Sequence, residues 1–186
     1  MLEILTEELA NAGFSVNGSK TKILTTDGAV TNNDAPLIAD IAEFMVEILR
    51  CESTHKYLGR LFSGNLRRRG QCNLNHRLAC GWFKFHKLST SLMNRNIPIH
   101  LRLKLFHSVI TPIICYSLTT TPLTATQLSR LDVVQRKMLR KMVGWVRFDD
   151  EDWEITSQRM KAKLEDALAR FPIPDWSMKE RQLHSE

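Results

Sequence analysis

The sequence predicts an α+β fold, a small β/α part followed by a mainly helical bundle. Short apolar runs separated by turn residues fill residues 1–66, and amphipathic patterns with helical spacing follow through residues 67–147. The 186 residues are 43% hydrophobic and 25% charged, which is enough apolar sequence to bury a core. Residues 148–186 are predicted to form a separate acidic helix and tail.

The first 66 residues are predicted to form a short helix and extended segments. Residues 2–12 carry leucines on one helical face, and an Asn-Gly turn at residues 17–18 precedes an extended segment over residues 21–26. Residues 27–36 are rich in Asn, Asp, Gly and Thr, which predicts a loop.

The next segment, residues 37–50, is ambiguous between helix and strand. Its Ala, Glu, Leu and Met residues favour a helix, whereas Phe44, Val46 and Ile48 alternate as in a strand. Residues 55–62 follow and end at a Ser-Gly pair, which favours a small two-stranded element.

Helical patterns dominate from Cys72 onward. The predicted helices cover residues 74–93, a stretch beginning at Pro98, residues 124–145 and residues 149–169. Pro112 should kink or end the second of them, and Thr124 is the expected N-cap of the third. The third helix is the most clearly amphipathic, and its apolar face contains Leu128, Leu131, Met138, Met142 and Trp145.

The basic charge of the chain is confined to its middle. Residues 1–55 hold three basic and nine acidic residues, and residues 148–186 hold six and ten. Between them, residues 56–147 hold 17 basic residues and a single acid, Asp132. A surface of one sign repels itself unless an anionic partner offsets it, so this stretch predicts contacts with nucleic-acid phosphates. A basic helical domain without such a partner is the alternative, and a membrane surface is disfavoured because several elements share the charge.

Several features predict an intracellular protein, with nucleus and cytoplasm equally open. Acidic and polar residues follow Met1 directly, whereas a signal peptide would begin with basic residues and an apolar run. The longest apolar runs, such as residues 109–116, are too short to span a bilayer. The cysteines show no disulfide framework, which indicates reduced thiols at Cys51, Cys72, Cys80 and Cys115.

Two groups of residues could suggest metal binding. Cys72, His76 and Cys80 would share one stripe of a helix, but a fourth zinc ligand is not evident, and a helix face with reduced thiols is the simpler interpretation. The acids at 149–152 are better explained as the start of a helix, where the helix dipole favours negative charge. No nucleophilic triad or glycine-rich phosphate loop stands out, so the residues alone predict a binding domain.

Two short motifs resemble segments of reverse transcriptases from non-LTR (LINE-type) retrotransposons. Residues 9–22, which read LANAGFSVNGSKTK, are similar to the family's palm motif D, and residues 55–59, HKYLG, are similar to its motif E, the primer grip. The pattern over residues 77–144 is similar to the family's helical thumb. The resemblance therefore makes residues 1–66 a palm-edge remnant and residues 67–147 a thumb.

The resemblance implies roles for individual residues. Lys20 matches the motif D lysine, which in the family lies near the incoming nucleotide and can protonate the leaving pyrophosphate, a general acid role. The thumb helices of the family track the template–primer backbone. The residues expected to bind nucleic acid are Lys22, Lys56, Tyr57, Leu58, Gly59, Arg77, Lys84, Arg136, Lys137, Arg140 and Lys141.

The departures from the family concern catalysis. The family holds two Mg²⁺ ions with aspartates of motifs A and C, the latter an aromatic-x-Asp-Asp turn. Phe148-Asp149-Asp150 lacks the intervening residue and lies beyond the predicted thumb, so we expect the metal-binding aspartates to be absent, the chain to begin after motif C and to be inactive alone. No cofactor is expected in this chain, and Mg²⁺ only in the complete family enzyme.

The expected partners are an RNA–DNA or DNA duplex and the missing palm and fingers of a longer chain. Two alternatives stay open. A second chain could supply the aspartates and assemble a working polymerase in trans. The chain could instead be a helical protein-interaction module that docks through the apolar face of residues 128–145.

Overall fold

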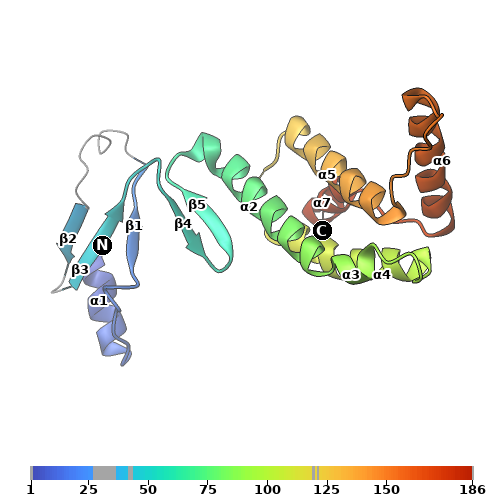
Figure 1. The fold of residues 1–186 in the computed structure, drawn as a ribbon. Coiled ribbons are helices and arrows are strands. Elements are labelled where there is room, and N and C mark those ends of the chain that lie inside the picture. Colours follow the sequence, from blue (N-terminus) through green and yellow to red (C-terminus); the bar gives the residue numbers. More distant parts are fainter. Residues whose placement is uncertain (1, 27–36, 42–43, 119, 121, 186) are drawn as a thin grey trace. The chain divides into compact units, whose positions relative to one another are not determined.

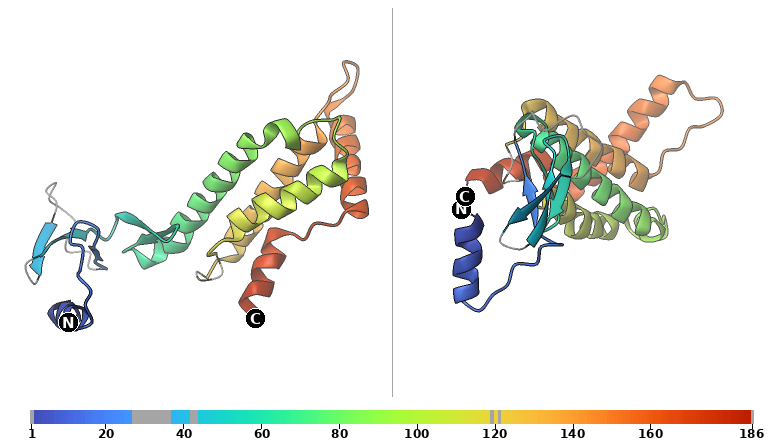
Figure 2. Two further views of the ribbon diagram at one scale, coloured as in Figure 1. Left: turned by 90° about the horizontal axis from the view of Figure 1, so that it is seen from below. Right: turned by 90° about the vertical axis from the view of Figure 1, so that its left-hand side faces the viewer.

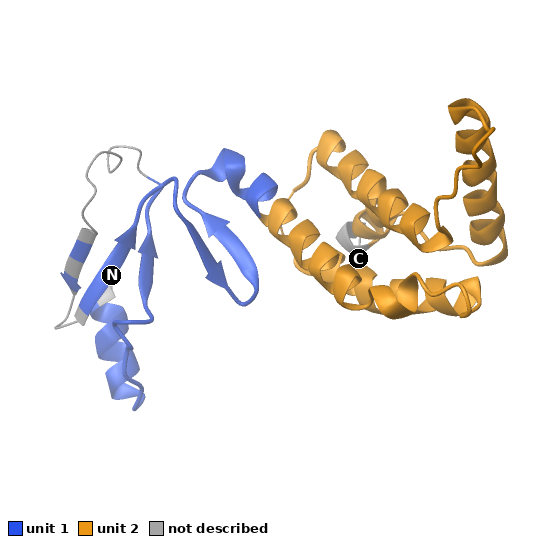
Figure 3. Cartoon of the chain, in the orientation of Figure 1, with its two compact units in different colours: residues 1–72 blue, residues 73–186 orange. Residues whose placement is uncertain are grey.

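The computed structural model describes residues 2–26, 37–41, 44–118, 120 and 122–185. The chain divides into two compact units, residues 1–72 and 73–186 (Figure 3). Strands and one short helix make up most of the first unit, and helices make up the second, which confirms the α+β fold class. The division falls after Cys72 rather than after Leu66, and residues 148–186 belong to the same unit as the predicted thumb.

The first unit contains a short helix and a mixed three-stranded sheet (Figure 1). Its elements are α1 (Leu2–Asn11), β1 (Lys22–Leu24), β2 (Leu37–Ile41) and β3 (Phe44–Leu49). The strand order is β1-β3-β2, with β1 parallel and β2 antiparallel to β3. The strand interpretation was therefore correct for the described residues 37–41 and 44–49 and the helical one wrong, and Val46 of the alternating set is buried. The predicted loop at residues 27–36 lies outside the described residues.

A separate hairpin completes the first unit. It pairs β4 (Thr54–Tyr57) with β5 (Arg60–Ser63) in antiparallel register, which confirms the predicted two-stranded element. Tyr57 pairs with Arg60, so Leu58 and Gly59 form a two-residue loop. Both have positive φ, 46° and 78°, as a type I′ turn requires.

The second unit is a bundle of helices, of which α2, α4 and α5 run side by side (Figure 2). Its elements are α2 (Leu66–Lys87), α3 (Ser89–Leu92), α4 (Ile99–Cys115), α5 (Ala125–Val143), α6 (Trp153–Arg170) and α7 (Trp176–Ser185). The first turns of α2, up to Cys72, belong to the first unit, and the rest of the helix belongs to the second. Pro112 does not stop α4 at once, because it lies in the last turn and the helix continues to Cys115. In the described part of the chain, no helix combines the length and apolarity that crossing a bilayer requires.

The structure confirms the predicted N-cap of α5, the helix with the clearest amphipathic pattern in the sequence. Thr124 caps the helix in a reciprocal capping box with Gln127. The apolar face is buried, including Leu131, Met138 and Met142. Trp145 is a correction: it lies beyond the end of the helix and is 40% exposed, not on the buried face.

The core of the second unit is formed by close helix contacts. Gly81 lets α2 approach α4, because a Cβ atom at this position would lie 2.1 Å from Cδ1 of Ile114. The Phe85 and Phe106 rings meet edge to face at 6.5 Å, and Phe106 stacks on Trp176 at 5.9 Å. This aromatic series joins α2, α4 and α7 in one core.

Helix α7 replaces the predicted tail. Trp176 is fully buried, and its Nε1 donates a hydrogen bond to Oγ1 of Thr111 at 3.0 Å. Gln135 accepts a hydrogen bond from the Trp176 amide and donates one to the Pro174 carbonyl, each 3.0 Å long. The C-terminal segment is thus part of the bundle core rather than an appendage.

Candidate nucleic-acid interface

The two family-like motifs contribute to one hollow in the first unit. This hollow has a volume of about 550 Å³ and is lined by Lys20, Thr21, Lys22, Leu24, Leu49, His55, Tyr57 and Phe62. His55 and Tyr57 are alternate residues of β4 and so share one face of the hairpin. Residues 20–22 and 55–57, distant in sequence, therefore border the same space.

Lys20 stands on a turn that Asn17 organises. The side-chain oxygen of Asn17 accepts hydrogen bonds from the Lys20 amide at 3.2 Å and from the Ser19 hydroxyl at 2.8 Å. The backbone oxygen of Asn17 accepts from the Thr21 amide at 2.9 Å. These bonds fix the backbone while the Lys20 side chain stays exposed, so a cation borders the hollow.

Lys22 has a different environment from Lys20. Its Nζ forms an ion pair with Glu47, the residue opposite it in the β1–β3 register. The pairing is possible only because the two strands are adjacent, although 25 residues separate the partners. Glu47 offsets the charge of Lys22, whereas Lys20 forms no ion pair with any acid in the described part of the chain.

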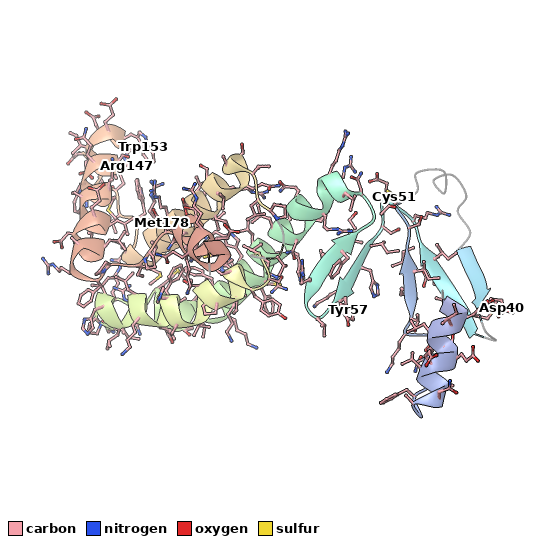
Figure 4. The ribbon with its side chains drawn as sticks, turned by 180° about the vertical axis from the view of Figure 1, so that it is seen from behind. Asp40, Cys51, Tyr57, Arg147, Trp153 and Met178 are labelled. Carbon is pink, nitrogen blue, oxygen red and sulfur yellow. The ribbon has the colours of Figure 1, made fainter. Side chains whose placement is uncertain are left out.

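The tip of the β4–β5 hairpin presents apolar side chains to solvent. Tyr57 lies there, as Figure 4 shows, with its ring 6.3 Å from that of Phe62 in an edge-to-face contact. Leu58 is 72% exposed and has a left-handed backbone, which is uncommon for a leucine. Lys56 points from the opposite face of β4 and is exposed. The type I′ turn requires this left-handed backbone, and it leaves the Leu58 side chain in solvent.

In the second unit, the exposed face of α5 carries most of the predicted phosphate ligands. Arg130, Lys137 and Lys141 repeat at helical spacing, with Arg140 beside them, and all four are exposed. Lys141 lies 5.2 Å from the centre of the Trp82 ring. Among the described residues, Lys137 and Arg140 form no ion pair.

The only acid of the basic stretch is turned away from this face. Asp132 accepts hydrogen bonds from the amide of Ser177 at 3.0 Å and from its hydroxyl at 2.6 Å, and so caps α7. No other acidic residue occurs in α5. Arg136, at the border of the face, has an acidic neighbour in Asp175, at 3.9 Å.

The two predicted ligands on α2 are less accessible. Arg77 is only 7% exposed, and its guanidinium carbon lies 4.8 Å from the centre of the Tyr116 ring. Lys84 is half-buried. The sequence reasoning therefore placed Arg77 on the surface, whereas the structure places its guanidinium against an aromatic ring.

The candidate metal ligands form other contacts. Cys80 Sγ and His76 Nε2 lie 3.7 Å apart, and the described residues include no set of three His, Cys, Asp or Glu arranged to hold a metal ion. In the acidic run, Glu151 binds the Arg159 guanidinium through both oxygens, at 2.8 and 2.6 Å. The Arg159 hydrogen bonds lower the pKa of Glu151 to about 2.

Sequence reasoning missed three residues that border these surfaces. His55 and Phe62 line the hollow beside Tyr57, and the alternation of β4 and its pairing with β5 could have identified them. Arg130 donates a 2.7 Å hydrogen bond to Oδ1 of Asn75 and opens the α5 series. Its spacing to Lys137 was the available signal.

Comparison with known proteins adds no relative. No protein-family model, no curated protein and no solved structure matches the chain. The resemblance of residues 9–22 and 55–59 to reverse transcriptases therefore stays a prediction, and the function must be argued from the residues described above.

Proposed function

We propose that this protein binds the phosphate backbone of an RNA–DNA or DNA duplex without reading its sequence. The observation that carries the proposal is the exposed face of α5, where Arg130, Lys137, Arg140 and Lys141 lie together while Asp132 is bonded to α7. Among the described residues, no carboxylate forms an ion pair with any of these four cations. Such a surface attracts polyanions, and it releases their counterions on binding.

The length of this face suits a duplex. From Arg130 to Lys141 the helix rises by about 17 Å, at about 1.5 Å per residue. One turn of a B-form duplex measures about 34–36 Å, so the series can follow roughly half a turn of phosphates. Side chains that contact only phosphates position a duplex and carry no sequence information.

The first unit supports a more specific form of the proposal. The hollow that joins Lys20 to Tyr57 brings together the two segments that resemble motifs D and E. We therefore propose that the chain is the palm-edge and thumb part of a non-LTR reverse transcriptase, with Lys20 near the incoming nucleotide and the Leu58 tip near the primer end. Nucleotide transfer would additionally require metal-binding aspartates and Mg²⁺. Such a role places the protein inside the cell, in nucleus or cytoplasm.

Salt-dependent binding tests the phosphate contacts. Fluorescence anisotropy with a labelled RNA–DNA hybrid should give a log–log salt slope of about −4 if four cations contact phosphate. The double variant Lys137→Ala/Arg140→Ala should reduce the magnitude of that slope by about 2. The matched control is Lys161→Ala/Arg181→Ala, which removes two exposed cations from α6 and α7 and should leave the slope unchanged.

Two outcomes would refute the proposal. A salt slope near zero would mean that phosphates are not contacted, and an equal loss in both double variants would assign binding to net charge alone. Three duplexes of unrelated sequence should bind with the same affinity, because the face offers phosphate contacts and no base readout. A primer-extension assay with Mg²⁺ should yield no product from this chain alone.

The alternative of a protein-interaction module loses its expected docking face. That face of α5 holds Leu131, Met138 and Met142, all fully or almost fully buried in the chain's own core. A partner would have to displace α7, which packs against α5 through Trp176 and Ser177. We therefore do not propose it as a second function.

A further inference from the structure

A second basic hollow lies within the helical unit. It has a volume of about 290 Å³, and four basic side chains, Arg95, Arg102, Lys163 and Arg170, line it together with one acid, Asp166. The hollow lies outside the set of residues assigned to duplex binding. Its lining leaves three positive charges in excess over the single carboxylate.

Arg102 gives the hollow a fixed positive charge. The residue is only 7% exposed, and its Nε donates a hydrogen bond to the Ile97 carbonyl at 2.9 Å. Its Nη1 donates to the carbonyls of Met142 at 2.6 Å and Leu92 at 3.3 Å. Among the described residues, no carboxylate forms an ion pair with Arg102. The guanidinium is therefore rigidly held and keeps its charge without an acidic partner.

Arg95 brings a second guanidinium close to the first. Its Nη2 would lie 3.0 Å from a Cβ atom placed on Gly144, so the side chain packs directly on the backbone that follows α5. Burial lowers the pKa of Arg102, and repulsion by Arg95 lowers it further. Like charges that line one small hollow destabilise each other, and an anion bound between them relieves this repulsion.

Helix α6 supplies the remaining charges. Lys163, Asp166, Ala167 and Arg170 recur at helical spacing and so share one face of α6. The Asp166 carboxylate lies 3.2 Å from Arg170 Nη2 and orients that side chain. Ala167 is buried and short, which leaves the space between the cations unfilled. Although residues 148–186 are acidic overall, α6 therefore contributes two cations, Lys163 and Arg170, to the hollow.

We propose that this hollow binds a phosphate monoester. Guanidinium groups match phosphate oxygens in pairs of parallel hydrogen bonds. A monoester carries about −1.5 to −2 charge at pH 7, against about −1 for a backbone diester, and so better offsets three excess cations. The volume of the hollow, about 290 Å³, is near the lower end of the range for ligand pockets, roughly 300–1,000 Å³. It therefore suits a small ligand, such as a phosphate group with a few further atoms. The monoester belongs either to the 5′ end of a nucleic-acid strand or to a small organic phosphate.

Calorimetric titration of the full chain with ribose 5-phosphate tests the proposal, at constant ionic strength and with ribose as the blank. We expect one site for ribose 5-phosphate and none for ribose. Arg170→Ala and Lys163→Ala should each weaken binding about 10- to 100-fold, the effect of one hydrogen bond to a charged group. Both residues are exposed, so the fold should survive, and thermal melting without ligand checks this.

Lys161→Ala is the matched control, because it removes one exposed cation from α6 that also has a carboxylate neighbour, Glu165 at 3.9 Å. It should bind ribose 5-phosphate as wild type does. The Lys137→Ala/Arg140→Ala variant should also bind normally, so failure of duplex binding and failure of this site are distinguishable. Absence of saturable binding, or equal weakening by Lys161→Ala and Arg170→Ala, would overturn the proposal.

Two oligonucleotides then identify the source of the monoester. They share one sequence and differ only in a 5′-phosphate or a 5′-hydroxyl. About tenfold tighter binding of the phosphorylated strand, lost in Arg170→Ala, assigns the site to strand ends. Equal binding of the two strands, with ribose 5-phosphate still bound, assigns it to small organic phosphates.

Discussion

Replacing Trp176 with alanine should destabilise the helical unit more than any surface change. Its indole is fully buried, stacks on Phe106 with an interplanar angle of 13°, and donates a 3.0 Å hydrogen bond to Thr111. Truncating a buried tryptophan costs about 3–5 kcal/mol, which includes the cavity left behind. The Thr111 hydroxyl is also fully buried and loses its donor, which adds about 1 kcal/mol or more.

The expected total is therefore about 4–6 kcal/mol in the free energy of unfolding. Domains of this size lose roughly 3–5 °C in Tm per kcal/mol, which corresponds to a decrease of about 12–30 °C. Urea unfolding followed by far-UV circular dichroism measures the free energy, and thermal melting measures Tm. The Trp176→Phe variant keeps the aromatic stacking and loses the hydrogen bond, so it should fall between wild type and Trp176→Ala.

The matched control is Met178→Ala, two residues along the same helix. Met178 is 56% exposed, and Figure 4 labels it on α7, so its truncation should change the free energy by less than about 0.5 kcal/mol. A loss below 1 kcal/mol in Trp176→Ala would refute the reasoning, because it would mean that α7 is not part of the core. A double-mutant cycle with Thr111→Val isolates the indole–hydroxyl term.

Three further outcomes follow from the structure. Gly81→Val should destabilise the fold by about 1–3 kcal/mol in urea unfolding, because its side chain would overlap Ile114, and unchanged stability would contradict that contact. Cys115 should stay unlabelled by a thiol reagent at pH 8 in the native chain and react in urea, because burial raises its pKa to about 11; fast native labelling found by mass spectrometry would contradict this. Glu151 has a folded-state pKa of about 2, below its ordinary 4.5. Its bond to Arg159 therefore stabilises the fold fully at pH values above 4.5, and this stabilisation is lost as the pH falls toward 2. Thermal melts should therefore show wild type above Glu151→Gln at pH 6 and the two converging near pH 2.

Local patterns predicted the parts of the fold that local chemistry determines. The cap at Thr124 and the amphipathic spacing of α5 both depend on residues that are near each other in the sequence, and the structure confirms them. The segment 37–50 resisted prediction because its composition favours a helix, while its pairing with a neighbouring strand favours a sheet. Helix α7 was missed because polar groups far along the chain hold it, Gln135 among them.

The candidate site shows the same limit. Exposed cations on a regular helix, such as Lys137 and Arg140, are placed correctly by spacing alone. Arg77 and Lys22 are not, because their partners Tyr116 and Glu47 reach them only through tertiary packing or strand register. The hollow around Arg102 could not be predicted for a similar reason, since its charges come from α4, from the turn before it and from α6, which lies in a region that is acidic on average.

If the protein binds a duplex as proposed, the cap that Asp132 provides for α7 links the stability of the bundle to that binding. While Ser177 holds the Asp132 carboxylate, this acid does not offset the four exposed cations of α5, and the acid near the border of the face is Asp175, beside Arg136. If α7 undocks, Asp132 loses both bonds, and its carboxylate can pair with Arg136, four residues further along α5. A duplex that prefers the docked state must then stabilise that state in return, because the two equilibria are linked. Undocking of α7 would thus weaken duplex binding although every residue that contacts the duplex is still present.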